Sequence, residues 1–216
     1  MAGRVWHVLD MPLQTRVLPT GEITAQGWRG SMMGNRGCLH GPDRRLGRSR
    51  WRHQNWVCCL TAFRGRWREA MPMRPARTIY TALFFWDEAS AFAAGHRPCG
   101  ECRRADYLRF RHAWREAGLP GETPSEIDRH LHRHRVARDR SQIRHEAEIE
   151  TLPFGAFILL DQSPAAWTGD RALLWSPEGY RDAGATPARV TVLTPKPVLN
   201  LFTAGYRPSL RLHESK

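Results

Sequence analysis

The stretch Thr78-Ile-Tyr-Thr-Ala-Leu-Phe-Phe-Trp86, followed by Asp87 and by Glu88-Ala-Ser-Ala-Phe-Ala-Ala94, decides much of the fold. Its first nine residues are mostly β-branched or aromatic, and such a composition predicts a buried strand. Asp87 is a favourable N-cap residue, and Gly95 is a favourable residue at which to end a helix. The sequence therefore predicts a strand over 78–86 and a short helix over 88–94.

A second helix is predicted directly after this unit. The segment His96-Arg-Pro-Cys-Gly-Glu-Cys102 turns into a stretch that carries apolar residues at helical spacing, and Gly118-Leu-Pro120 ends it. Those apolar residues are Tyr107, Phe110, Trp114 and Ala117. We expect Cys99 and Cys102 in the first turn of this helix, where free amides and the helix dipole favour the thiolate that a metal requires.

The cysteine pattern favours a metal over disulfides. Five cysteines are an odd number, and the chain begins without a secretory signal, so a disulfide framework is not expected. A thioredoxin-like Cys-x-x-Cys pair would follow a strand, whereas Cys99 and Cys102 follow an alanine-rich helix. The pair therefore predicts a zinc site, and a helix start without a metal remains the alternative.

A local resemblance supports the same conclusion. Phe84-Phe85, Glu88-Ala89 and Ala94-Gly-His-Arg-Pro-Cys-Gly-Glu-Cys102 resemble, in order and spacing, the zinc-binding N-terminal domain of the Ada DNA-repair protein family. In that family four cysteines hold one zinc ion, and one of them accepts a methyl group from a DNA phosphotriester. The resemblance implies that Cys99 and Cys102 are zinc ligands and that DNA is the partner.

The other half of the zinc site departs from this family. Ada-type domains carry a Cys-x-x-x-Cys pair shortly before the aromatic strand, and this chain has none. Neighbouring strand residues point to opposite faces, so only one of Cys58 and Cys59 on the predicted strand 56–63 can easily face a metal. We expect a four-coordinate site formed by Cys38, Cys59, Cys99 and Cys102, with Cys58 or His40 as substitutes. The departure argues against methyl-acceptor activity and predicts a zinc ion that staples the fold.

Charge is unevenly distributed along the chain. There are 33 Lys+Arg against 21 Asp+Glu, a net charge of +12, and only Lys196 and Lys216 are lysines. Twelve arginines and two acids lie between Arg29 and Arg77, whereas 146–182 holds seven acids and two arginines. Such segregation predicts a surface for nucleic acid, since phosphate contacts contribute affinity through counterion release. A solvated basic face, or a patch for an acidic protein, is the alternative.

The predicted DNA-binding arginines lie around the cysteines and in a basic loop over 41–53 that we expect to order on phosphate. They are Arg36, Arg44, Arg45, Arg48, Arg50, Arg52, Arg64, Arg66, Arg97, Arg103 and Arg104. The glycine-rich stretch 21–37 would allow close approach of a ligand, with Asn35 reading a base, although a tight hairpin fits it equally.

A third helix is predicted from Thr123 to about Ala147. Thr123-Pro-Ser-Glu126 fits a capping box with proline at the first helical position. Asp128 and His132 lie at i and i+4, so they share a face and form a candidate acid–base pair. A metal-binding face and a solvated basic helix are the alternatives. No glutamate lies between the histidines, and a zinc protease is therefore disfavoured.

The C-terminal third predicts a small antiparallel sheet, with strands over 156–160, 172–175 and 189–193 between Gly/Pro turns. The expected fold is thus α+β: a small zinc-stapled helix–strand module over 1–120, a basic helix over 121–150 and a β-rich part over 151–216. One compact domain is the alternative to this division.

These features predict a zinc-containing protein that acts on DNA bases, most concretely a DNA glycosylase for a damaged or modified base. Asp128 and His132 would activate water, and Asn35 would contribute to recognition. A non-enzymatic zinc DNA-binding module is the first alternative, and a nuclease, which needs clustered carboxylates, is the second. Zn²⁺ is the expected cofactor, with no small-molecule cofactor. The sequence shows neither an apolar run of membrane-spanning length nor the apolar core of a secretory signal, so we expect a cytoplasmic protein without membrane contact.

Overall fold

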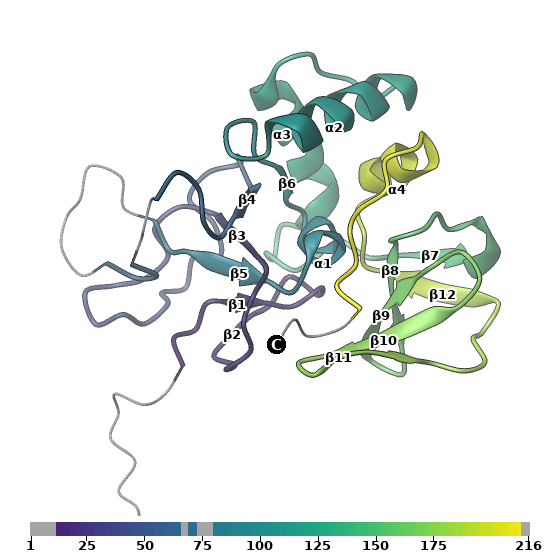
Figure 1. Ribbon diagram of the computed structural model, residues 1–216, viewed down its shortest axis with the longest axis horizontal. Helices are drawn as coiled ribbons and strands as arrows, with labels where there is room; N and C mark the ends of the chain where they lie inside the picture. The colour runs from purple at the N-terminus through teal and green to yellow at the C-terminus, as the bar shows by residue number, and fades with distance from the viewer. Residues whose placement is uncertain (1–11, 66–68, 73–79, 213–216) are drawn as a thin grey trace, which may run out of the picture.

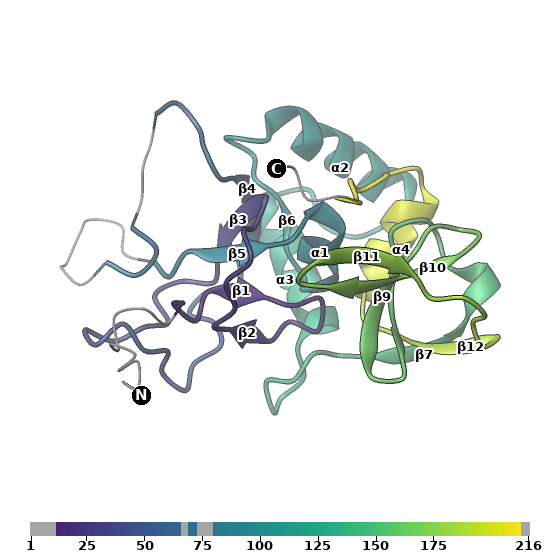
Figure 2. The same cartoon turned by 60° about the horizontal axis from the view of Figure 1, so that its bottom comes forward.

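Two six-stranded sheets and four α-helices form the described part of the chain, in a computed structural model that covers residues 12–65, 69–72 and 80–212 (Figure 1). The sheets lie on either side of the first helix, as the views in Figures 1 and 2 agree. The predicted α+β class is confirmed. No helix in these ranges is both long and apolar enough to cross a membrane.

The first sheet is mixed and is built by the N-terminal half of the chain. Its strands are β1 (Arg16–Val17), β2 (Ile23–Thr24), β3 (Met32–Asn35), β4 (Val57–Leu60), β5 (Leu83–Phe85) and β6 (Arg97–Pro98). Their order is β2-β1-β5-β3-β4-β6, with β1 parallel to β5 and β4 parallel to β6, while the other neighbours are antiparallel.

The strand–helix unit at the centre of the chain follows the sequence prediction. After β5, the helix α1 (Glu88–Ala93) begins at Asp87, whose side chain accepts a hydrogen bond from the Ser90 amide at 2.8 Å. Gly95 ends the turn at φ +84°, and a Cβ there would lie 2.6 Å from the Arg135 side chain. The position therefore needs glycine both for its backbone conformation and for its close contact. The strand itself is shorter than predicted, and residues 78 and 79 lie outside the described ranges.

The second helix begins later than the sequence suggests. Helix α2 (Arg104–Glu116) has its N-cap at Arg103, so Cys99 and Cys102 lie in the turn between β6 and α2. The prediction that they occupy the first helical turn is therefore wrong. Pairing of β6 with β4 holds the backbone extended up to Pro98, which delays the helix.

The third helix ends twelve residues before the predicted end near 147. Helix α3 (Pro124–Arg135) has the expected capping box between Thr123 and Glu126, but Val136 is already extended. Residues 136–142 then form a tight turn closed by a bridge between Val136 and Gln142. The chain continues as β7 (His145–Glu148), because this segment forms an edge strand of the second sheet by pairing with β12.

The second sheet is antiparallel throughout, as predicted. Its strands are β7, β8 (Phe157–Leu160), β9 (Ser163–Trp167), β10 (Ala172–Ser176), β11 (Gly179–Asp182) and β12 (Arg189–Val192). Their order is β11-β10-β9-β8-β12-β7. The three predicted strands correspond to β8, β10 and β12. Helix α4 (Lys196–Thr203), which follows the sheet, is not among the predicted elements, because two prolines at its start indicate a turn as readily as a helix N-terminus.

The two sheets share a core around α1. Trp28, Trp86 and Trp175 pack edge to face, with ring centroids 5.9 to 6.4 Å apart, and Phe157 of β8 belongs to the same buried cluster. Trp28 and Trp86 come from segments next to strands of the first sheet, and Phe157 and Trp175 come from the second sheet. The two halves therefore bury apolar surface against each other rather than only within themselves.

The segment after α4 runs back along the start of α1 (Figure 1). The buried Asp87 carboxylate accepts a hydrogen bond from the Arg211 amide at 3.0 Å. The buried Glu88 carboxylate accepts hydrogen bonds from the Tyr206 hydroxyl at 2.6 Å and from the Ser209 amide at 2.9 Å. Two neighbouring acids thus fasten the C-terminal segment to the centre of the molecule.

Candidate metal centre and arginine–tryptophan pocket

Three cysteines converge at the end of the β4–β6 pair. The Sγ atoms of Cys59, Cys99 and Cys102 all lie within 4.8 Å of one another. The register explains why: Cys58 is the β partner of Pro98, and the Cys99 amide donates to the Cys58 carbonyl at 2.9 Å. Cys59 therefore lies beside the turn that carries Cys99 and Cys102. We refer to these residues as the cysteine triad.

The cysteine triad has the donor chemistry of a metal site. A hydrogen bond with the Cys59 thiol lowers the pKa of Cys99 to about 5, so one thiolate is present at neutral pH. Three sulfur ligands at this separation can bind one metal ion and leave room for a fourth ligand. A pocket of about 260 Å³ opens over the triad, and Met33, Tyr80 and Phe84 are among the residues that line it.

The other predicted ligands lie elsewhere. Cys38 donates to the His40 carbonyl at 3.6 Å and is not part of the triad, because β3 carries the chain past the start of β4, away from Cys59. The His40 ring bonds the Thr81 hydroxyl at 2.7 Å. Cys58 faces the other side of β4, and burial raises its pKa to about 12. The predicted four-cysteine set is thus corrected to three.

Two predicted DNA-binding arginines are buried ion-pair partners. Arg97 donates to both carboxylate oxygens of Asp128, at 2.7 and 2.6 Å, and both side chains are almost fully buried. Arg103 is buried against Glu88 and also donates to Asp106 at 2.7 Å. These guanidinium groups are buried and neutralise internal carboxylates, which argues against the prediction that Arg97 and Arg103 contact DNA.

The predicted acid–base pair is not assembled. Both oxygens of Asp128 are engaged by Arg97, and its carboxylate has no hydrogen bond to His132 among the described contacts. His132 instead packs edge-on against Trp51 and Trp56, and burial, together with the Arg135 charge, lowers its pKa to about 4. A neutral imidazole and an occupied carboxylate do not provide the expected activation of water.

Asn35, the third predicted catalytic residue, stabilises a turn. Its Oδ1 atom accepts hydrogen bonds from the Gly37 amide at 3.2 Å and, when that ring nitrogen is protonated, from His53 Nε2 at 3.0 Å. These contacts stabilise the end of β3. The role of Asn35 in recognising a base stays a prediction.

The remaining predicted arginines are mostly exposed. Arg45, Arg48, Arg50, Arg52, Arg64 and Arg104 are exposed, whereas Arg44 is paired with Glu69 at 2.8 Å, and Arg66 lies outside the described residues. The turn after α3 joins this surface, because Arg140 donates to the Arg48 carbonyl at 3.2 Å. We call the exposed arginines of these two segments the arginine rim: Arg45, Arg48, Arg50, Arg52, Arg138, Arg140 and Arg144.

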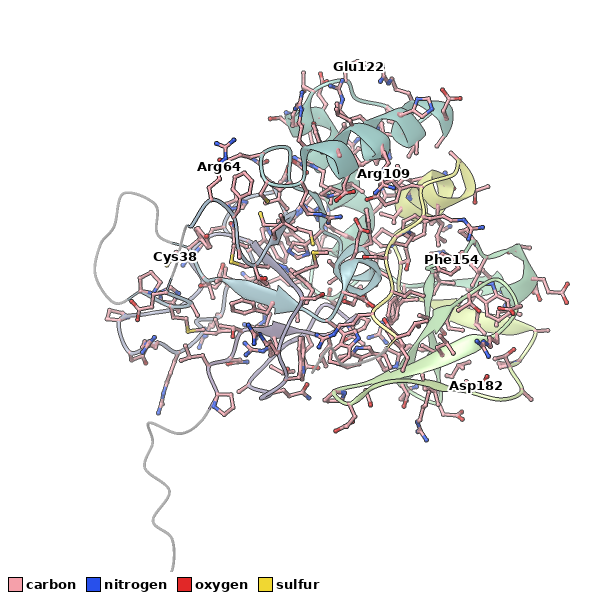
Figure 3. All side chains as sticks on the ribbon, viewed as in Figure 1. Cys38, Arg64, Arg109, Glu122, Phe154 and Asp182 are labelled. Carbon is pink, nitrogen blue, oxygen red and sulfur yellow. The ribbon has the colours of Figure 1, made fainter. Side chains whose placement is uncertain are left out.

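A basic residue of the first half and an acidic residue of the second sheet can be compared directly in space. In Figure 3, Arg64 of the first half and Asp182 of β11 project on opposite sides of the molecule. These two positions follow the uneven charge distribution along the sequence, whereas Arg144 of the arginine rim directly precedes β7 with its acids Glu146 and Glu148.

A second pocket, of about 320 Å³, opens between the two segments of the arginine rim. It is lined by Arg36, Arg135, Trp51 and Trp56, by three rim arginines and by polar side chains of 14–23 and 141–142. The guanidinium carbons of Arg36 and Arg135 lie 4.1 and 4.0 Å from the ring centroid of Trp56. We call this cavity the Arg–Trp pocket. Sequence reasoning placed Arg36 on the surface and missed Arg135, and no local motif marks either.

Comparison with known proteins gives no relative: no family model, no curated protein and no solved structure matches this chain.

Proposed function

We propose that this chain is a zinc-containing DNA-binding protein that acts on DNA bases. The observation that carries the proposal is the arginine rim around the Arg–Trp pocket. Its seven exposed arginines lie on two adjoining segments, 41–53 and 136–144, whose two acids, Asp43 and Asp139, cap local turns. Such a surface suits the phosphates of a duplex, which a protein grips mainly with basic side chains.

Zinc is the metal that best fits the cysteine triad. Soft thiolate ligands in a small tetrahedral site favour Zn²⁺ over the oxygen-preferring Mg²⁺ and Ca²⁺. A redox role would need only two cysteines, whereas three converge here. In the proposed protein the ion joins β4 to the turn before α2, so it stabilises the half of the molecule that carries the rim.

Removing rim charge is expected to weaken DNA binding in a salt-dependent way. The triple variant Arg45→Ser, Arg48→Ser, Arg138→Ser should lower the slope of log affinity against log salt by about 3, because each lost phosphate contact removes about one unit. The measurement is fluorescence anisotropy with a 20-base-pair duplex between about 50 and 200 mM salt.

The matched control removes the same charge from the second sheet. Arg171, Arg181 and Arg189 are exposed arginines on or beside β10, β11 and β12, and their replacement by serine should leave the slope nearly unchanged. Equal losses in the two triple variants would mean that net charge alone attracts DNA, and the proposed interface would then be wrong.

Base excision is the most concrete reaction of such a protein, and one residue favours it. Glu22 is the acidic side chain among those that line the Arg–Trp pocket. A carboxylate at this position can activate water and stabilise the cationic sugar that forms when a base leaves an extruded nucleotide. With Asp128 engaged by Arg97, Glu22 is the acid to test.

Labelled duplexes with natural, alkylated, deaminated or otherwise modified bases test this chemistry. Base excision predicts strand breaks that require alkali and no added metal, and it predicts their loss in Glu22→Gln but not in Glu116→Gln, an exposed acid at the end of α2. Direct nicking that requires magnesium would instead indicate a nuclease. Binding without any product would exclude both reactions for these substrates and leave DNA binding alone.

A further inference from the structure

Among the residues that the structure describes, four arginines have almost fully buried side chains, and they fall into two classes. Arg97 and Arg103 each bond a buried carboxylate. Arg36 and Arg135, with exposed fractions of 3% and 2%, take part in no ion pair among the described residues. Both of the latter line the Arg–Trp pocket.

The contacts of Arg36 and Arg135 are with neutral atoms. Arg36 donates to the carbonyls of Gly21 and Ala94, at 3.3 Å each. Arg135 donates to the carbonyls of Gly95 and Gln54, at 2.7 Å each. The Nε–H of each arginine has no hydrogen-bond partner. Arg135 Nη2 also lies 3.2 Å from the Nδ1 atom of His132. Neither guanidinium is in direct contact with a carboxylate among the described residues, so each lacks the bound anion that usually compensates its loss of hydration.

The electrostatics of the pocket agree with this geometry. Burial, together with the nearby charge of Arg50, lowers the pKa of Arg36 to about 9. Burial also lowers the pKa of Arg135; the charge of Asp128 partly opposes this shift, and the charges of Arg36 and Arg97 add to it. Both shifts mean that the surroundings of the two guanidinium groups disfavour positive charge, so an anion bound between them would be stabilised by both groups.

Two further buried polar atoms without hydrogen-bond partners indicate which uncharged hydrogen-bonding groups a ligand should carry. Gln142 donates through Nε2 to the carbonyls of Pro19 and Ala93, which fixes its Oε1 atom as an acceptor without a donor. The Thr20 hydroxyl also lacks a partner. Both residues line the Arg–Trp pocket, so its ligand should carry hydrogen-bond donors as well as an anion.

We propose that the Arg–Trp pocket binds one nucleotide, with its phosphate on Arg36 and Arg135 and its sugar or base donors on Gln142 and Thr20. A phosphate matches the forked donors of two arginines, and a nucleotide also carries the hydroxyl and amino donors that the orphan acceptors require. The half-exposed ring of Trp51 offers an apolar wall for the base. The volume of about 320 Å³ is that of a small-molecule site.

The arginine rim forms the entrance of the Arg–Trp pocket. Arg50, Arg140 and Arg144 line the same pocket. Arg140 adopts φ +74°, a conformation unfavourable for a residue other than glycine, and its side chain is held on the Arg48 carbonyl. The proposed function bears only on where the nucleotide comes from. The nucleotide is either the terminal residue of a DNA strand, whose 5′ end presents the most accessible phosphate, or a free nucleotide.

Calorimetry with defined probes tests the pocket. The probes are the four deoxynucleoside 5′-monophosphates, the corresponding nucleosides, inorganic phosphate, and one oligonucleotide prepared with a 5′-phosphate and with a 5′-hydroxyl. Monophosphates, or the 5′-phosphorylated strand, should bind about 100-fold more tightly than the matching probe without phosphate, since two charge-assisted contacts are lost with it. Inorganic phosphate should bind more weakly than a nucleotide. Nucleosides that bind as well as nucleotides, or nucleotide probes that do not bind in any form, would overturn the proposal.

Single substitutions distinguish a loss of nucleotide binding from a loss of folding. Arg36→Gln should abolish the preference for phosphate. Arg144→Ala, at an exposed position that cannot disturb the core, should reduce nucleotide affinity several-fold even if Arg36→Gln does not fold. Arg181→Ala on β11 is the matched control and should bind nucleotides normally. Unchanged affinity in Arg144→Ala together with a folded, phosphate-selective Arg36→Gln would contradict the assignment.

The outcomes also separate this inference from the proposed function. Free monophosphates that bind to a protein without duplex affinity would support the pocket and contradict DNA binding. Duplex binding that depends on the rim, with no effect of any phosphate probe, would support DNA binding and contradict the pocket.

Discussion

Asp128→Ala is expected to destabilise the protein by about 3–5 kcal/mol, because it leaves the buried Arg97 guanidinium without its carboxylate. Urea unfolding monitored by tryptophan fluorescence measures this loss. Glu122→Ala is the control: Glu122 is exposed and lies 3.9 Å from Arg111, so its removal should cost less than about 1 kcal/mol.

The same experiment distinguishes structural from catalytic roles for Asp128. The double variant Arg97→Met, Asp128→Leu should recover most of the lost stability, because it removes both charges and fills their space with apolar atoms. An Asp128→Ala protein that unfolds like the parent chain would contradict the structural role and return Asp128 to the list of catalytic candidates.

Cys99→Ala combined with Cys102→Ala is expected to abolish metal binding, from about one zinc ion per chain to almost none, because two of three thiolate ligands are lost. Elemental analysis of protein purified without added metal measures the content, and thermal unfolding measures the accompanying loss of stability.

Cys38→Ala separates the cysteine triad from the four-cysteine site that the sequence predicts. Since Cys38 lies outside the triad, this variant should keep its zinc and its melting temperature. Full retention of metal in the double variant would show that the triad does not bind the ion, and loss of metal in Cys38→Ala would restore Cys38 as a ligand.

The sequence predicts most reliably what depends on local signals. Asp87 and Gly95 bound α1, and Thr123 with Glu126 caps α3, because each signal acts within a few residues of the backbone group that it satisfies. The end of α3 could not be read in the same way. Residues 136–147 do not carry a strong helix-breaking signal, and they leave the helix because β7 gains a strand partner from a distant segment, β12.

The candidate site was predictable only in part, because some of its residues meet through contacts between segments that are distant in the sequence. Cys99 and Cys102 are close in sequence, and their motif is visible, whereas Cys59 joins them through the register of a parallel strand pair. Net charge could not show which arginines are internal: Arg97 meets Asp128 across 31 residues, and Arg36 and Arg135 meet only around Trp56. The Arg–Trp pocket draws on five separate segments and therefore leaves no pattern in any one of them.

The fastening of the C-terminal segment by Asp87 and Glu88 has a consequence for synthesis in the cell. The two acids leave the ribosome more than a hundred residues before Tyr206, Ser209 and Arg211, which satisfy them. A nascent chain therefore cannot complete the centre of the molecule until residues 206–211 have been synthesised and have left the ribosome, although the first sheet and α1 are already available. A ribosome stalled before residue 206 should hold a chain that proteases still cut near α1.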